Sequence, residues 1–466
     1  MQKTLFSKLW NQHEVLKQGS GMSLLYIDRI FLHERTGSVS LKELELKGRK
    51  IKNPEQVFCT MDHIVDTLPG RDDNTIMPSG RDFIVSTRDA ANKAGINLFD
   101  IGNDKQGIVH VISAEQGITL PGLTQVCPDS HTCTLGALGA LAWGIGSSEG
   151  EHALATKTLS VKKPKLMRVR FEGNLNQGVT SKDMILYLIG KYSASGGVGH
   201  AIEFSGDTIN SLEQEARFTL CNMAVEFGCF TGLIAPDQKT FDFIYDRPFA
   251  PKERDFENAL VFWKKLYSDD DAVYDKEIFV KSNDINPQVS WGTSPGHVID
   301  INGFIPNPDE ISDLSLRSSF LKAIDYMDLK PGQRMDSISI DAAFIGSCTN
   351  SRISDLRDVA KLVKGRKVSS GVKAIIVPGS TQIKHQSESE GLDIIFKEAG
   401  FEWRESGCSM CFYVGGESFK KGSRVVSSTN RNFENRQGPG IKTHLASPVT
   451  VAASAIKGKI TDVRRI

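Results

Sequence analysis

Apolar residues along the chain follow two spacings, one typical of helices and one typical of strands. The helical spacing is clearest at Leu356, Val359, Ala360 and Val363, which form one stripe that stops at Gly365. Further helices are expected on either side of residues 24–28 and over residues 83–94. Short apolar runs predict strands at residues 24–28, 57–63, 107–112, 123–127, 167–171, 201–204 and 338–345. Strands that alternate with helices are typical of βαβ units, so we predict an α/β fold with mostly parallel sheets.

The length of the chain and two polar segments divide it into three predicted domains. A chain of 466 residues is longer than one hydrophobic core usually supports. The sequence Lys-Lys-Pro-Lys at residues 162–165 marks the first boundary. The charged stretch 246–287, which we expect to form a connecting helix, marks the second. Residues 180–183 are expected to form a capping box, and the Gly/Ala-rich stretch 135–146 to pack closely against other backbone. The predicted domains span residues 1–163, 164–287 and 288–466.

Charge and composition exclude several classes of protein. Lys and Arg together number 56, as do Asp and Glu, so the net charge is zero and no basic nucleic-acid-binding surface is expected. No apolar run reaches the ~18 residues of a membrane span. The first residues lack the apolar core of a signal peptide, and eight cysteines without such a signal favour a reducing compartment. We therefore expect a cytoplasmic enzyme.

Three cysteines in Gly- and Ser-rich turns form the strongest candidate for a metal site. Cys408 and Cys411 form a Cys-x-x-Cys pair, and Cys348 lies in the sequence Gly-Ser-Cys-Thr-Asn-Ser between a predicted strand and a predicted helix. Three thiolates suit an iron–sulfur cluster or zinc, and a set of three leaves one metal position open for chemistry. The remaining cysteines are expected to be structural; they are Cys59, Cys127, Cys133, Cys221 and Cys229.

A second group of candidates combines carboxylates with imidazoles. A carboxylate beside a histidine fixes its tautomer and raises its basicity, as general acid–base catalysis requires. Predicted strands end at several such pairs, where open α/β sheets place their sites. The candidates are Asp62, His63, His110, Asp129, Ser130, His131 and Glu226. The other seven histidines, His33 among them, are expected to be packed or surface residues.

The polar loop at residues 428–436 is a candidate for binding carboxylates. It contains Arg431 and Arg436, and a guanidinium matches a carboxylate in a forked pair. Taken alone, two arginines in a loop are more often surface ion pairs.

In this order, these motifs resemble the aconitase superfamily of [4Fe–4S] hydro-lyases, most closely its 3-isopropylmalate dehydratase branch. The resemblance covers essentially the whole chain. Its motifs lie at residues 24–28, 61–63, 107–110, 129–132, 221–226, 344–351, 407–411 and 430–433. The resemblance implies three α/β/α domains around a central cleft.

The resemblance also assigns roles to residues of this sequence. Three cysteines would hold a [4Fe–4S] cluster whose fourth iron is labile and open to substrate; they are Cys348, Cys408 and Cys411. Acid–base catalysis would fall to Asp62 with His63, His110 with Asp129, and His131 with Glu226. Substrate binding would fall to Ser130, Asn430, Arg431 and Arg436.

The reaction that the resemblance implies is the interconversion of 2-isopropylmalate and 3-isopropylmalate through isopropylmaleate, in leucine biosynthesis. Single-chain relatives continue into a fourth, swivelling domain that contributes a catalytic serine. This chain ends at Ile466, so we expect a separate small subunit to supply that domain in a heterodimer.

Four other interpretations remain open at this stage. The same chemistry could act on homoaconitate, or on citraconate and 2-methylmalate. The three cysteines could hold zinc in a hydrolase. The form without a cluster could bind RNA as a regulator, which the neutral charge disfavours. A purely structural role is the least favoured.

Overall fold

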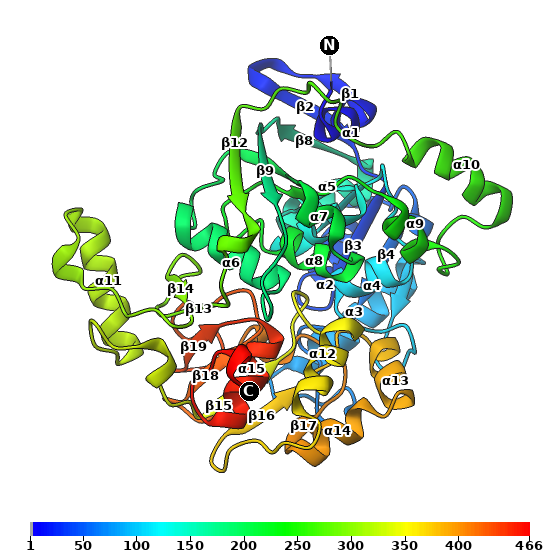
Figure 1. Cartoon of the computed structure of the whole chain (residues 1–466). Helices are drawn as coiled ribbons and strands as arrows, with labels where there is room; N and C mark the ends of the chain where they lie inside the picture. Colours follow the sequence, from blue (N-terminus) through cyan, green and yellow to red (C-terminus); the bar gives the residue numbers. More distant parts are fainter. Residues whose placement is uncertain (1–2) are drawn as a thin grey trace. The chain divides into compact units, whose positions relative to one another are not determined.

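The computed structural model describes residues 3–466 and confirms the α/β class (Figure 1). The chain forms two compact units, described separately below. Unit 1 contains the residues up to Val65, Asp72–Asn174 and Gly197–Lys281. Unit 2 contains Asp66–Arg71, Leu175–Gly196 and Ser282–Ile466. The division into three domains at residues 163 and 287 stays a prediction. None of the helices among residues 3–466 is long and apolar enough to cross a membrane.

A parallel five-stranded sheet in unit 1 carries several of the predicted site residues at its edge. Its strand order is β5-β4-β3-β6-β7. The strands are β3 (Arg29–His33), β4 (Val57–Thr60), β5 (Asn97–Phe99), β6 (Thr124–Cys127) and β7 (Leu141–Gly144). Phe31, Phe58 and Phe99 pack together in its core. The register pairs His33 with Thr60, so both segments leave the sheet at the same edge.

Two further sheets complete the strands of unit 1. A parallel sheet has the order β11-β10-β9-β12, with β9 (Lys165–Glu172), β10 (His200–Ser205), β11 (Gly232–Leu233) and β12 (Lys276–Lys281). An antiparallel sheet has the order β1-β2-β8, with β1 (Glu14–Lys17), β2 (Met22–Tyr26) and β8 (Thr158–Lys162).

The helices of unit 1 lie between these strands in the chain. The α-helices are α1 (Leu5–His13), α2 (Gly37–Leu46), α3 (Gly80–Ala94), α4 (Val109–Glu115), α5 (Ser147–Thr156), α7 (Asp207–Ser211), α8 (Gln214–Asn222), α9 (Gln238–Ile244) and α10 (Glu253–Trp263). The 3₁₀ helices are η1 (Gly19–Gly21), η2 (Pro54–Gln56) and η3 (Ser130–Leu138).

Unit 2 contains a second parallel five-stranded sheet, with the order β17-β16-β15-β18-β19. Its strands are β15 (Ala342–Ile345), β16 (Lys373–Ile376), β17 (Phe401–Trp403), β18 (Arg424–Ser427) and β19 (Lys442–Leu445). A short antiparallel pair is formed by β13 (Gln288–Ser290) and β14 (Val298–Asp300).

The helices of unit 2 include the stripe predicted at residues 356–363, whose four apolar residues are all buried in α12. The α-helices are α6 (Ser181–Tyr192), α11 (Leu314–Met327), α12 (Ile353–Val363), α13 (Thr381–Ser389), α14 (Leu392–Ala399) and α15 (Pro448–Lys457). The 3₁₀ helices are η4 (Ser282–Asp284), η5 (Pro308–Glu310), η6 (Met335–Ser337), η7 (Ser409–Cys411) and η8 (Val463–Arg465). The predicted capping box at the start of α6 is confirmed.

Three sequence-based predictions of elements are wrong in part. Residues 107–112 were expected to form a strand, but α4 begins at Val109, whose backbone N–H donates to the buried Asp62 carboxylate at 2.9 Å. A helix start with a satisfied N–H group prevails over the strand preference of this Val- and Ile-rich run. Residues 29–33 form a strand where a helix was expected. The segment 246–287 contains strand β12 as well as helix α10.

The close backbone packing expected at residues 135–146 is confirmed at Gly136. A Cβ atom built there would lie 1.7 Å from the carbonyl oxygen of Gly232 and 2.9 Å from its carbonyl carbon. Because backbone atoms cannot move aside as a flexible side chain can, only glycine fits between η3 and β11.

We predict that Gly136→Ala destabilises unit 1 by about 1–3 kcal/mol, because the added methyl group forces the two backbone segments apart. Thermal unfolding followed by circular dichroism measures the effect. Gly19→Ala is the matched control, because nothing lies within 4 Å of a Cβ atom there. Equal unfolding midpoints for the two variants would contradict the assigned packing.

Candidate active site

The predicted site residues fall into two sets, one within each unit. The set in unit 1 is Asp62, His63, His110, Asp129, Ser130, His131 and Glu226. The set in unit 2 is Cys348, Cys408, Cys411, Asn430, Arg431 and Arg436. Their geometry is described below, and their roles stay predictions.

The Asp62–His63 pair lies in an irregular turn after β4, and this turn is organised by the buried carboxylate of Glu34. The backbone N–H groups of Asp62 and His63 donate to Glu34 at 3.0 and 2.7 Å, and those of Ile64 and Val65 donate to it as well. Four backbone donors without a strand or helix partner are thereby satisfied. The turn fixes the backbone beneath His63.

Carboxylates flank both ring nitrogens of His63. Nδ1 lies 2.6 Å from Oδ1 of Asp62, and Nε2 lies 3.4 Å from Oδ2 of Asp129. Burial by itself lowers the pKa of His63, but the carboxylates of Asp62 and Asp129 outweigh burial and hold that pKa well above its usual value. His63 is therefore protonated at neutral pH and can donate a proton.

Asp129 is the hub of the unit 1 set, because it contacts three histidines. Besides His63, its Oδ1 lies 2.7 Å from Nε2 of His110 and accepts the backbone N–H of His131 at 2.8 Å. His131 in turn places Nε2 3.1 Å from Oε1 of Glu226. Burial raises the pKa of Asp129, but the three histidines outweigh burial and hold that pKa well below its usual value. The predicted pairs, His110 with Asp129 and His131 with Glu226, are both in contact.

Two residues of this set occupy positions that the sequence did not indicate. His110 was expected at a strand end but lies in the first turn of α4, buried, with Nδ1 lacking a hydrogen-bond partner within residues 3–466. Ser130 begins η3, with its hydroxyl 3.4 Å from Nδ1 of His131.

Sequence reasoning missed His33 and Glu34. The His33 ring stacks on that of His63 with the centroids 4.3 Å apart, and its Nε2 donates to the carbonyl of Pro128 at 3.2 Å. Burial, aided by the positive charge of His63, lowers the pKa of His33 to about 4, so His33 is neutral. The signal that could have revealed both residues is the end of β3, but that strand was not predicted.

Four residues form a compact group that could hold a metal ion: His33, Glu34, Asp62 and His63. Their possible ligand atoms all lie within 4.8 Å of one another, and no other His, Cys, Asp and Glu group among residues 3–466 meets this distance. Its carboxylates already accept N–H groups from the backbone and from His63. His63 carries a positive charge, which repels a cation. The carboxylate oxygens of this group therefore serve as hydrogen-bond acceptors that hold the turn, and we do not assign a cation to it.

In unit 2, Cys348 and Cys411 belong to one buried sulfur site. The Ser347 hydroxyl lies 4.0 Å from the Cys348 sulfur and 3.4 Å from the Cys411 sulfur. The Asn430 amide donates to the Cys348 sulfur at 3.6 Å. Ser347 adopts the left-handed φ of +82°, which a non-glycine residue rarely takes and which brings its hydroxyl to both sulfurs.

The short turn η7 connects Cys408 to Cys411. The backbone N–H of Cys411 donates to the carbonyl of Cys408 at 2.9 Å. Between the two cysteines, the Met410 side chain is buried in the apolar cluster of the unit 2 sheet, and its carbonyl accepts the Gln437 amide at 3.0 Å. The turn is therefore anchored to the sheet from both its side chain and its backbone. All three cysteines are buried, and none of them forms a disulfide.

The loop that carries Asn430 and Arg431 is held by a buried ammonium group. Lys182 of α6 is fully buried, and its Nζ donates to the carbonyls of Ser428 and Thr429 at 2.8 and 2.6 Å. Arg431 is half-buried. At Arg436, the guanidinium lies 4.3 Å from the ring centroid of Phe412 and 5.1 Å from that of Phe433.

Four of the other cysteines have raised thiol pKa values, as expected of structural residues. Burial raises the pKa well above its usual value at Cys59, Cys127, Cys221 and Cys229. A thiol that stays protonated is a poor metal ligand and a poor nucleophile.

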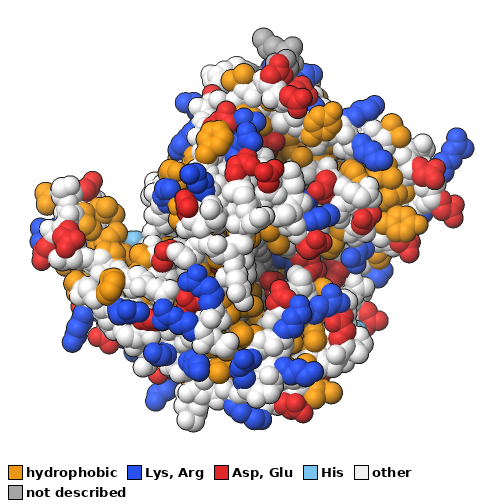
Figure 2. Space-filling view, in the orientation of Figure 1, with side chains coloured by type: hydrophobic (Ala, Val, Ile, Leu, Met, Phe, Trp, Pro, Cys, Tyr) orange, Lys and Arg blue, Asp and Glu red, His pale blue; other side chains and the backbone are white. Residues whose placement is uncertain are grey.

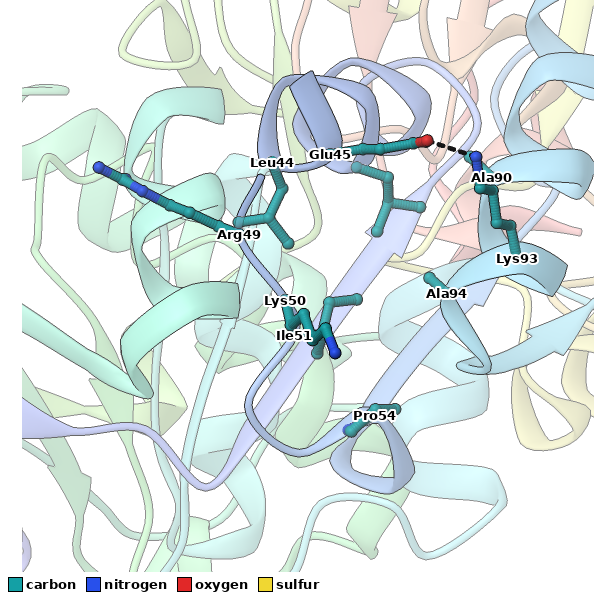
Figure 3. Close-up of a pocket in the computed structure, with 10 residues that line it drawn as sticks. Leu44, Glu45, Arg49, Lys50, Ile51, Pro54, Ala90, Lys93 and Ala94 are labelled. Atoms are coloured by element: carbon teal, nitrogen blue, oxygen red, sulfur yellow. Dashed lines mark hydrogen bonds and ion pairs between the residues drawn. The ribbon is translucent and has the colours of Figure 1, made fainter. Parts of the chain in front are cut away.

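Unit 1 also contains a cavity of about 420 Å³ (Figure 3). Apolar side chains of α2 and the following segment line it, including Leu44, Ile51 and Pro54. Its only carboxylate, Glu45, pairs with Lys93 across the cavity. None of the predicted site residues lines this cavity, so the cavity is not part of the candidate active site.

We predict that Asp129→Asn lowers the pKa of His63, because it removes one of the two negative charges that stabilise the protonated ring. Titration of histidine ring resonances by NMR in histidine-labelled protein measures this change. Resonances of the exposed His152 serve as the internal control. An unchanged His63 titration would show that Asp129 does not act on that ring.

Two comparisons with known proteins cover nearly the whole chain. The aconitase family (aconitate hydratase) matches residues 7–458. A protein from Bradyrhizobium diazoefficiens named 3-isopropylmalate dehydratase large subunit 1 is 49% identical over 462 residues, which cover 99% of this chain and 96% of that protein. Both agree with the resemblance seen in the motifs, and the chain therefore belongs to the aconitase family.

Proposed function

We propose that the protein is the large subunit of a [4Fe–4S] hydro-lyase that interconverts 2-isopropylmalate and 3-isopropylmalate in leucine biosynthesis. The observation that carries the proposal is the buried sulfur site beside Ser347, together with a histidine whose two ring nitrogens each lie beside a carboxylate. The substrate follows from the name of the 49% identical relative.

The residues of the sulfur site fit an iron–sulfur cluster. Cys348, Cys408 and Cys411 are soft, buried ligands, and the hydroxyl and amide donors at Ser347 and Asn430 stabilise negative charge on sulfur. When bound, the cluster would supply a Lewis-acidic iron that makes hydroxide a better leaving group. Three cysteine ligands would leave that iron open to substrate.

Proton transfer is assigned to the unit 1 set. The protonated His63 would give its proton to the departing hydroxyl, and Asp62 at 2.6 Å would hold its ring and its charge. Asp129 would keep His63 charged between turnovers. His110 with Asp129 and His131 with Glu226 would act as the supporting acid–base pairs.

Substrate binding is assigned to polar residues of both sets. Asn430 and Arg431 lie in a loop that Lys182 holds rigidly, which suits the orientation of a carboxylate. The Arg436 guanidinium lies close to the rings of Phe412 and Phe433, and these contacts would help to hold it in place for a carboxylate. Ser130 would contact substrate from the start of η3.

We propose a small subunit as the partner, because the relative is named a large subunit. The partner would supply the swivelling domain and its catalytic serine, and the isolated chain would then be inactive. Eight buried cysteines that form no disulfide suit a reducing compartment, which we take to be the cytoplasm.

Two alternative functions are distinguished from the proposed one by specific observations. A zinc hydrolase would hold one ion with the same three cysteines, but it would lack the broad visible absorbance of an iron–sulfur cluster, so that absorbance distinguishes the two. An RNA-binding role would need a basic surface, whereas basic and acidic side chains are intermixed on the face drawn in Figure 2. Homoaconitate and citraconate or 2-methylmalate remain alternative substrates for the same chemistry.

We predict that Cys348→Ala abolishes the broad visible absorbance of the anaerobically reconstituted protein. It should also abolish turnover of isopropylmalate by the chain assembled with its small subunit. Cys229→Ala is the matched control, because it removes another buried thiol and should leave both signals intact. A Cys348→Ala protein with full iron content and activity would refute the ligand assignment.

We predict that His63→Gln lowers kcat by ~10²–10⁴-fold, the usual contribution of a general acid, while the cluster absorbance is retained. Steady-state assays of the assembled enzyme measure kcat, and exposed His152→Gln is the control. A wild-type kcat for His63→Gln would remove His63 from the mechanism.

A further inference from the structure

Glu417 is a buried acidic residue of unit 2 that no step of the proposed mechanism uses. Only 5% of its surface is exposed. It accepts the backbone N–H of Thr67 at 2.7 Å and the Thr67 hydroxyl at 2.7 Å, and the Ser409 hydroxyl donates to it as well. The Arg404 guanidinium lies 3.5 Å away and balances its charge.

Ser409 is the residue through which Glu417 acts on the cysteine turn. It directly follows Cys408 and adopts a left-handed φ of +48°. A non-glycine residue rarely adopts this conformation unless its surroundings hold it there. The hydrogen bond to Glu417 supplies such a restraint, and it fixes the direction in which the turn presents Cys408 and Cys411.

Thr67 belongs to a short segment, Asp66–Arg71, that follows the Asp62–His63 turn in the chain and is part of unit 2. Three further contacts tie this segment to the cysteine turn and to the residues just before it. The carbonyl of Thr67 accepts the backbone N–H of Glu405 at 2.8 Å, the Arg71 guanidinium donates to the Ser406 carbonyl, and the hydroxyls of Thr67 and Ser409 lie 3.0 Å apart.

The chemistry of these contacts suits a carboxylate. Glu417 faces three donors, namely one N–H and two hydroxyl groups, and a carboxylate offers acceptor lone pairs on both oxygens. A glutamine of the same shape would place an NH₂ group where one carboxylate oxygen accepts, so at least one hydroxyl would have to turn from donor to acceptor and the present network would be lost.

We propose that Glu417 is a positioning residue that couples the order of the Cys408–Cys411 turn to the order of the Asp66–Arg71 segment. The coupling is reciprocal, since any ligand that orders one segment orders the other through the shared carboxylate. Glu417 acts on the cysteine turn through Ser409, whose hydroxyl donates to it. Only the ligand at the cysteines rests on the proposed function.

The first test is hydrogen exchange followed by mass spectrometry on the full chain without iron. Glu417→Gln should speed amide exchange in peptides that cover both residues 66–71 and residues 408–417. Glu398→Gln, which alters an exposed carboxylate of the same unit, is the matched control and should change neither. Unchanged exchange in both peptides of Glu417→Gln would overturn the proposal.

The second test uses Thr67→Val, which also decides the question if Glu417→Gln does not fold. This variant removes the Thr67 hydroxyl and keeps the backbone N–H bond to Glu417. It should speed exchange in the distant peptide 408–417 as well as in its own. A change confined to residues 66–71 would contradict the coupling.

The third test uses the anaerobically reconstituted chain and a chelator. Glu417→Gln should lose its visible absorbance about 10–100-fold faster than the wild type, as expected for a residue that orients a metal ligand. Equal rates would contradict the positioning role. If the wild-type chain takes up no cluster, the proposed function fails while the exchange results on the iron-free chain still decide the role of Glu417.

Discussion

Asp129 is the group on which the rest of the proposed acid–base site depends. Its carboxylate contacts His63, His110 and His131 and also accepts a backbone N–H, so three imidazoles share one negative charge in a buried setting. A buried charge is stable only where donors and opposite charges compensate it. Because this carboxylate contacts each of the three histidines, the place of Asp129 just after β6 determines where the three rings lie. The sheet provides that position. Strand β6 runs parallel to β3, and β3 runs parallel to β4. Asp129, just after β6, and the Asp62–His63 turn, just after β4, therefore both lie at the carboxyl ends of the strands.

Two other buried carboxylates, Glu34 and Glu417, accept hydrogen bonds from the backbone of irregular turns. Irregular turns leave backbone N–H groups without partners, and such groups are costly when buried. Glu34 accepts four of them in the turn that carries His63. Glu417 accepts one N–H and two hydroxyl groups at the turn that carries Cys408 and Cys411. In each unit, therefore, a carboxylate that is not proposed to touch substrate shapes the turn that presents the reactive groups.

The sequence predicted those parts of the molecule whose signals are local. The apolar runs before Asp62, Asp129 and Cys348 form strands, and the stripe after Cys348 forms a helix. Residues 107–112 were assigned wrongly because a Val- and Ile-rich run prefers a strand, and the Asp62 carboxylate that starts the helix lies elsewhere in the sequence. His33 was missed because strand β3 was missed. Glu417 could not be found at all, since its donor Thr67 lies 350 positions away and only the fold joins them.

The central claim is that three cysteines leave one iron of a cluster open to a hydroxy acid. Mössbauer spectroscopy of the chain, reconstituted with ⁵⁷Fe and assembled with its small subunit, tests this claim most directly. The account predicts one iron environment that differs from the others and that changes when isopropylmalate is added. Equivalent irons that ignore the substrate, or a preparation that binds zinc and no iron, would contradict it.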